Sequence, residues 1–167
     1  DPAAASFTAI GNLTMARQLH TATLLANGHV LITGGIGILA TAELFARSIP
    51  DLSVTITKAK VKAKDLGNKL TVKVNISNLG MESATGPLVA SLFLSADETL
   101  DAQDTLLQTI TLNKKRPFKA GKVKKKKFKV LGLASILGMF AIVDIDSVAG
   151  EENTINNTVT QAISGTL

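Results

Sequence analysis

Hydrophobic and polar residues alternate with a period of two along most of the chain, which is the pattern of strands with one buried face. Leu52, Val54 and Ile56 share one face of a predicted strand over 51–63. Four aliphatic residues alternate in the same way over 70–76, which predicts a second strand.

Further strands follow at short intervals, with no amphipathic helix of useful length between them. The segment 87–94 is apolar on both faces, as expected for a strand inside a sheet. The remaining strands are predicted over 106–112, 122–129, 139–145 and 158–163. Seven strands at this spacing predict an all-β sandwich.

Three shorter β-prone runs precede the sandwich, at 21–25, 29–33 and 41–45. Asn27-Gly28 lies between the first two and predicts a tight hairpin turn, because both residues tolerate positive φ. Pro50 follows the third run and marks the predicted boundary. We therefore expect a β-strand extension over 1–50, which is not stable alone, and a sandwich domain over 51–167.

The extension resembles one kelch repeat, the blade unit of a β-propeller. The residues that carry the resemblance are Met15, Arg17, His20, Asn27-Gly28, Val30-Leu31, Gly34-Gly35 and Ala42-Glu43-Leu44. No second period of about 40–50 residues follows, so the resemblance implies blade-like strands over residues 11–45 but no propeller within this chain. A single blade cannot bury its apolar side chains and is expected to pack on something else.

A second ordered series of motifs covers residues 51–163. It consists of Asp51-Leu52, the strand from Leu70 to Asn78 with Gly80, the stretch from Leu92 to Asp104, the strand from Ala141 to Asp146, and the ending Glu151–Asn157. This series resembles the CARDB module, an Ig-like β-sandwich named for cell-adhesion-related domains of bacteria and also found in archaea. Thr154 stands where the family usually has Glu, and Met139-Phe140 replaces its usual tyrosine pair. The resemblance implies a seven-stranded Ig-like sandwich in an extracellular or cell-surface protein.

The composition excludes several kinds of chemistry. The chain has no cysteine, so disulfides, thiolate metal sites and cysteine nucleophiles cannot form. His20 and His29 have no third ligand nearby in the sequence, and no catalytic triad order or phosphate-binding glycine loop is evident. We therefore expect a protein that is not an enzyme and has no cofactor. The longest apolar run, 130–143, is too short and too broken by glycine to span a bilayer.

The net charge of +5 is concentrated in one lysine-rich run. Since alternate residues of a strand point to opposite faces, both faces of this run are charged, and we expect a solvated edge strand that resists aggregation. The alternative is a patch for an anionic partner such as a glycan. Phe128 is the one aromatic residue in this run, so the run has no series of aromatic side chains on which bases could stack, which disfavours nucleic acid. The candidate interaction residues are Lys122, Lys124, Lys125, Lys126, Lys127 and Lys129.

Carboxylates crowd the loop that follows the 87–94 strand. Asp97, Asp101 and Asp104 have a spacing at which their oxygens could ligate calcium, although no EF-hand pattern is present. The alternative is an acidic turn whose carboxylates accept hydrogen bonds from its own amides. A metal or sugar site is one interpretation of the polar residues Glu151, Glu152, Asn153, Asn156 and Asn157. The interpretation we favour is a structural turn, because asparagine bonds readily to nearby main chain.

These features favour a non-catalytic, exported structural or adhesive protein. Asp1 in place of a start methionine is consistent with a removed signal peptide. The unclosed blade favours self-assembly, in which the N-terminal strands pair with a neighbouring copy to form a homo-oligomer or surface filament. The alternatives are a binding module for anionic polysaccharide and an accessory fragment of a larger kelch-propeller protein.

Overall fold

The structure is a computed structural model, which describes residues 12–25, 29–36, 41–45, 49–64, 67–112, 116–134 and 136–166. The chain forms two compact units, Asp1–Arg47 and Ser48–Leu167. Within the described ranges the regular structure is all strand, apart from one short 3₁₀ helix, η1 (Ile155–Asn157). None of the helical structure in those ranges is long and apolar enough to cross a bilayer.

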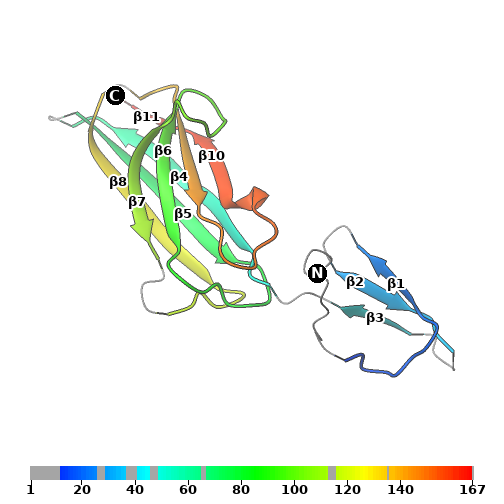
Figure 1. Cartoon of the computed structure of the whole chain (residues 1–167). Helices are drawn as coiled ribbons and strands as arrows, with labels where there is room; N and C mark the ends of the chain where they lie inside the picture. The colour runs from blue at the N-terminus through cyan, green and yellow to red at the C-terminus, as the bar shows by residue number, and fades with distance from the viewer. Residues whose placement is uncertain are drawn as a thin grey trace. The chain divides into compact units, whose positions relative to one another are not determined.

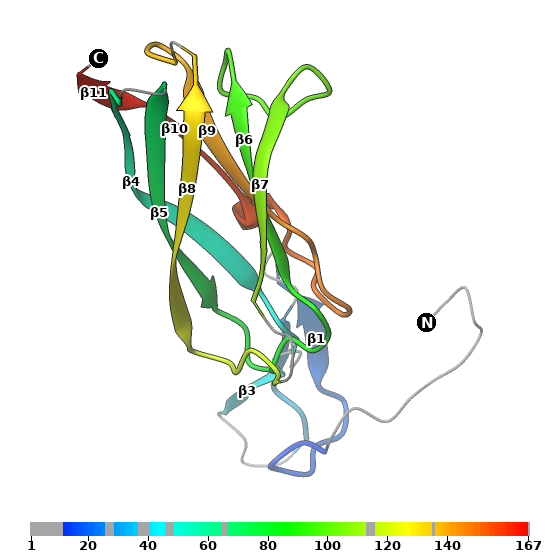
Figure 2. The same ribbon diagram turned by 90° about the vertical axis from the view of Figure 1, so that its left-hand side faces the viewer.

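The second unit is a sandwich of two four-stranded sheets (Figure 1 and Figure 2). One sheet has the order β11-β4-β5-β8 and contains β4 (Leu52–Lys62), β5 (Asn68–Asn78), β8 (Val123–Leu133) and β11 (Ser164–Thr166). The other has the order β10-β9-β6-β7 and contains β6 (Val89–Ser95), β7 (Thr105–Thr111), β9 (Phe140–Ile145) and β10 (Thr158–Ala162). This architecture confirms the predicted all-β sandwich, including the interior position of β6.

The inward faces of the two sheets form one aliphatic core. Alternate residues of β5, from Leu70 to Ile76, are 1% exposed or less, and Leu92 of β6 meets them from the other sheet. Phe118 and Phe128 are the largest of the fully buried side chains. Full burial of one such apolar side chain stabilises the fold by about 1.5–3 kcal/mol.

A β-bulge in β4 changes which residues of that strand face the core. The register with β5 shifts between Ile56 and Lys58, and the Thr57 hydroxyl donates a hydrogen bond to the Lys73 carbonyl there. Before the bulge the even-numbered residues face inward, and after it Ala59 and Val61 do, each 1% exposed. The sequence pattern predicted one strand here, but it did not predict that the inward residues change from even-numbered to odd-numbered. One extra residue on β4 produces this change.

The sandwich has eight strands and not the predicted seven. The additional strand, β11, pairs in parallel with β4, with Ser164 opposite Lys60. The Ser164 hydroxyl also donates to the Ala59 carbonyl, at 3.1 Å. A Cβ on Gly165 would lie 2.3 Å from the Val61 carbonyl oxygen, so a larger residue does not fit. Three polar or small residues have no hydrophobic alternation, and the sequence therefore did not indicate this strand.

The first unit is a three-stranded antiparallel sheet of β1 (Thr21–Leu24), β2 (Val30–Thr33) and β3 (Ala42–Phe45), in the order β1-β2-β3. These strands agree with the three predicted runs, whereas the predicted Asn27-Gly28 turn lies outside the described residues. The buried hydrophobic residues that the structure describes all belong to the second unit. The first unit is therefore held together mainly by polar contacts.

Arg17 and Glu43 form the centre of those contacts. The Arg17 guanidinium donates to the Gly34 and Thr41 carbonyls and forms a 2.8 Å ion pair with Glu43. The other carboxylate oxygen of Glu43 accepts hydrogen bonds from the Thr14 hydroxyl and amide. The Thr14 hydrogen bonds are the largest cause that lowers the pKa of Glu43 from 4.5 to about 2. Arg17 and Glu43 thus have a structural role in the first unit.

Asn78, at the end of β5, joins three segments of the sandwich. Its side chain is fully buried, and its amide donates to the Glu82 and Phe118 carbonyls at 2.7 and 2.9 Å. Its amide oxygen accepts from the backbone N–H groups of Asp51 and Gly80, at 3.2 and 3.1 Å. Both N–H donors and both acceptor positions of the Asn78 side-chain amide are therefore used inside the protein.

We expect Asn78→Ala to destabilise the second unit by about 3 kcal/mol, because it leaves several buried backbone groups without partners. Asn75→Ala is the control on the same strand, since Asn75 lies on the outward side, and should change stability by less than about 0.5 kcal/mol. Urea denaturation of both variants measures the difference. Equal stability of the two variants would contradict this role of Asn78.

Candidate functional site

The outward side of the sheet β11-β4-β5-β8 carries a dense set of lysines. The inward residues of β4, β5 and β8 alternate with outward positions, and most of those outward positions near the middle of the sheet are lysine. We call this set the lysine face. It consists of Lys58, Lys60 and Lys62 of β4, Lys69 and Lys73 of β5, and Lys125, Lys127 and Lys129 of β8.

The strand register brings these lysines into rows across the sheet. Lys58 lies opposite Lys73, and Lys73 lies opposite Lys127, so three ammonium groups form one row. Lys60 and Lys129 flank Thr71 in the next row. Neighbouring strands are about 4.8 Å apart and alternate residues about 6.8 Å apart. Figure 2 shows β4, β5 and β8 side by side.

The charges of the lysine face act on one another. The pKa of Lys127 lies below its usual value of 10.5, first because of the positive charge of Lys129 and then because of partial desolvation. Lys73, Lys69 and Lys58 lower it further. The four strands of this sheet contain no aspartate or glutamate that would offset the repulsion.

The lysines predicted as interaction residues divide between two surfaces. Lys125, Lys127 and Lys129 belong to the lysine face. Lys124 and Lys126 pair with inward positions of β5, and Lys122 precedes β8. The Lys124 ammonium lies 4.6 Å from the centre of the Phe118 ring, and burial is the main cause that lowers its pKa.

The strand β8 lies at the edge of its sheet, as predicted. The Gln108 side chain of β7 accepts a hydrogen bond from the Lys129 backbone N–H at 3.0 Å. One backbone donor of the edge is therefore occupied from the other sheet. Together with the lysines, this contact reduces the tendency of the edge to pair with another chain.

The acidic loop between β6 and β7 uses its carboxylates within its own turns. Asp97 accepts from the Thr99 amide, Asp101 from the Gln103 amide and Asp104 from the Asp101 amide, at 2.7–3.0 Å. Within the described part of the chain, no group of three or more His, Cys, Asp or Glu side chains is placed to hold a metal ion. The geometry favours the turn interpretation, and calcium at Asp97, Asp101 and Asp104 has no support from it.

The turn after β9 fixes the start of β4. One oxygen of Glu151 accepts from the Leu52 amide at 2.6 Å, and the other accepts from the Val148 amide at 3.0 Å. The Asn156 amide donates to Asp51 at 3.0 Å. These contacts favour the structural interpretation of Glu151 and Asn156.

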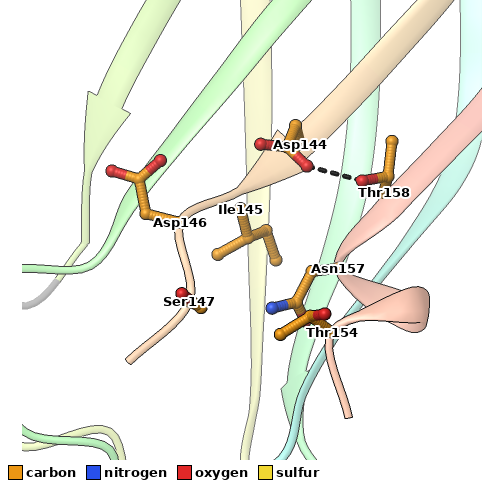
Figure 3. Close-up of a pocket in the computed structure, with 7 residues that line it drawn as sticks. All are labelled: Asp144, Ile145, Asp146, Ser147, Thr154, Asn157 and Thr158. Carbon is orange, nitrogen blue, oxygen red and sulfur yellow. Dashed lines mark hydrogen bonds between the residues drawn. The ribbon is translucent and has the colours of Figure 1, made fainter. Parts of the chain in front are cut away.

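A polar depression of about 530 Å³ lies beside the end of β9. Figure 3 shows its lining, in which the Thr158 hydroxyl donates to the Asp144 carboxylate. The Asn157 side chain is 2% exposed, and neither its amide nitrogen nor its amide oxygen has a hydrogen-bond partner. The lining residues are Asp144, Ile145, Asp146, Ser147, Thr154, Asn157 and Thr158.

Sequence reasoning missed five residues of the lysine face and the polar depression. Lys58, Lys60 and Lys62 alternate with small and apolar residues in the sequence, and this alternation could have indicated a charged outward face. The position of Lys58 opposite Lys73 depends on the bulge, which the sequence pattern does not indicate. The depression combines two separate segments and has no local sequence pattern.

Comparison with known proteins supplies no functional assignment. No protein-family model matches the sequence, and neither does any curated protein. The CARDB domain of a Pyrococcus furiosus protein, solved in complex with di-metal ions, is similar at 18% identity and a TM-score of 0.45. The alignment covers 70% of this chain and 90% of that domain. The kelch resemblance of residues 11–45 finds no support in these comparisons.

A β-glucosidase from Kluyveromyces marxianus, solved in complex with glucose, is similar at 13% identity and a TM-score of 0.38. The alignment covers 69% of this chain but only 15% of the enzyme. At such identities and scores, neither the metal ions nor the glucose can be carried over to this chain.

We expect Lys73→Gln to raise the melting temperature by about 1–3 °C at low salt, because Lys73 is the middle charge of a three-lysine row. The gain should shrink at 0.15 M salt, where the screening length falls to about 8 Å. Lys122→Gln removes the same charge away from the lysine face and should have little effect. Thermal unfolding at both salt concentrations measures this, and an identical response of the two variants would contradict repulsion within the row.

Proposed function

We propose that the chain is a non-catalytic, exported binding module whose lysine face holds an anionic polysaccharide. The observation that carries this proposal is the convergence of eight outward lysines from three neighbouring strands. Such a surface has a positive potential that attracts an extended anion and increases its rate of association.

Repulsion within the face supports a polymeric partner. Like charges directly opposite each other destabilise a sheet, and no acidic residue of these four strands offsets them. A polymer with regularly spaced carboxylates or sulfates would neutralise several lysines at once. Each exposed ion pair contributes only about 0.2–1 kcal/mol, so useful affinity requires many contacts along one chain.

The lack of aromatic side chains on the face supports a polysaccharide over a nucleic acid. The one aromatic residue within these strands, Phe128, is fully buried in the core. Bases would therefore have no ring on which to stack. Carboxylate or sulfate groups of a sugar polymer need only the ammonium charges.

The test is calorimetric titration of the full chain with sodium alginate at low and at 0.15 M salt. We expect binding that weakens as salt rises, because the contacts are exposed ion pairs. The variant Lys58→Gln/Lys73→Gln/Lys127→Gln removes one complete row and should bind at least about tenfold more weakly, a loss of about 1.4 kcal/mol.

The matched control is Lys119→Gln/Lys122→Gln/Lys126→Gln, which removes the same charge from exposed lysines outside the face. This variant should keep its affinity within about threefold, a difference below 1.4 kcal/mol. An equal loss of alginate affinity in the two variants would mean that binding depends on the net charge of the chain and not on the lysine face. Equal binding to neutral dextran would contradict an electrostatic contact.

A second candidate function rests on the first unit. The fully buried hydrophobic residues in the described ranges lie outside it, and every residue of its edge strand β1 is exposed. Leu24 of β1 is 73% exposed. We propose that this strand pairs with a neighbouring copy at the cell surface, which would bury its apolar residues and produce a homo-oligomer or filament.

Sedimentation velocity over a range of concentrations tests this assembly. We expect the full chain to form larger species as its concentration rises, and Leu24→Lys to prevent this by placing a charge on β1. Leu79→Lys is the control, since Leu79 is 62% exposed on the second unit. A chain that stays monomeric at every concentration, or that loses assembly equally in both variants, would contradict pairing through β1.

A further inference from the structure

The polar depression beside β9 belongs to a different sheet from the lysine face. It is formed by the end of β9, the residues that follow it, η1 and the start of β10. Asp144 and Asp146 contribute carboxylates, and no lysine or arginine lines it. Its charge is thus opposite to that of the lysine face, and an anionic ligand would be repelled.

Asn157 is the unusual residue of this depression. Its side chain is 2% exposed, yet both of its polar atoms lack a partner, although most buried polar side chains are hydrogen-bonded. Its backbone N–H donates to the Thr154 carbonyl at 3.2 Å, which fixes the residue in the turn. In Figure 3 the amide nitrogen of Asn157 points toward the side where Ser147 lies, across the depression.

The unpartnered amide restricts the chemistry of a ligand. A metal cation would satisfy only the amide oxygen, and an ammonium group can only donate, so each would leave the amide hydrogens unpaired. A hydroxyl group both donates and accepts. Two adjacent hydroxyls can therefore accept from the Asn157 nitrogen and donate to its oxygen, while further hydroxyls donate to carboxylates.

The size and the lining agree with a ligand that carries several hydroxyls. A volume of about 530 Å³ is much larger than a single ion requires and lies within the usual range of small-molecule pockets. Asp146, Ser147 and Thr154 offer additional acceptors and donors around the same space. The buried Ile145 contributes an apolar contact for the carbon face of a ring.

We propose that this depression binds an uncharged sugar unit through adjacent hydroxyl groups, with Asn157 as the central contact and Asp146 as an acceptor. The site is separate from the lysine face, and its ligand is a single neutral sugar ring where the lysine face takes an anionic polymer. A chain with both sites could hold two chemically different carbohydrates.

The experiment is an NMR titration of the ¹⁵N-labelled full chain with the methyl glycosides of glucose, galactose and mannose. We expect at least one glycoside to give saturable shifts of the Asn157 side-chain NH₂ and of the backbone amides over 144–147 and 154–158. Asp146→Asn, at an exposed position, should weaken the binding at least tenfold. Asp101→Asn is the matched control in another acidic turn and should leave it unchanged.

Asn157→Leu separates binding from folding. The leucine side chain has the same number and branching of heavy atoms and removes the unpartnered amide, so this variant should melt at a higher temperature than the wild type while it loses the glycoside shifts. The variant Lys58→Gln/Lys73→Gln/Lys127→Gln should keep the glycoside shifts, because it changes only the lysine face. Failure of alginate binding would therefore leave this result unaffected.

Three results would overturn the proposal. The first is that none of the three glycosides shifts the resonances of the depression. The second is that the shifts persist in both Asn157→Leu and Asp146→Asn, which would place the sugar elsewhere. The third is that calcium chloride shifts these resonances while the glycosides do not, which would identify a cation site.

Discussion

The fully buried side chain of Asn78 joins separate segments of the sandwich through its hydrogen bonds. The four hydrogen bonds of Asn78 connect the residue before β4, the segment after β5 and the Phe118 carbonyl of the segment before β8. A Cβ on the nearby Gly80 would lie 2.2 Å from the Ile49 carbonyl oxygen. The segment that leads into β4 therefore packs directly against the Gly80 backbone, where only glycine fits. Glu151 then fixes the Leu52 amide from the opposite end of the sequence. Polar contacts thus place the first residues of β4 at the point where the aliphatic core begins.

The two candidate sites divide the surface of the second unit by charge. The sheet with β4, β5 and β8 has lysines and no carboxylates in its strands, whereas Asp144 and Asp146 lie on β9 and just beyond it. Concentration of like charges costs stability, and the protein lacks internal acidic partners on that sheet to reduce the cost. The buried amide of Asn157 has a similar character, since an unpaired polar group also costs stability. The stability cost of both features is part of the reason why we propose binding sites there.

The all-β sandwich, the position of most strands along the chain and the edge position of the lysine-rich strand could be predicted from the sequence, because each depends on local alternation. Leu70, Val72, Val74 and Ile76 repeat at every second position, and all of them are buried. The pairing of β11 with β4 could not be predicted, since it rests on Gly165 fitting closely against Val61. The lysine face was predicted only for its β8 members, because the remaining lysines join them through strand register. Asn157 was interpreted as an ordinary turn residue, and only the burial of its amide reveals that it lacks a partner.

The bulge at Thr57 has a consequence for how this surface could change in evolution. It divides β4 into a half whose inward residues are even-numbered and a half whose inward residues are odd-numbered. Loss of one residue at the bulge would restore continuous alternation in β4. With the first half of the strand held in place, Lys58 and Lys60 would keep their outward positions and Ala59 and Val61 their inward ones, because the bulge accommodates only the one extra residue. The bulge can therefore arise or disappear by insertion or deletion of one residue without exchanging the charged and the apolar face of β4.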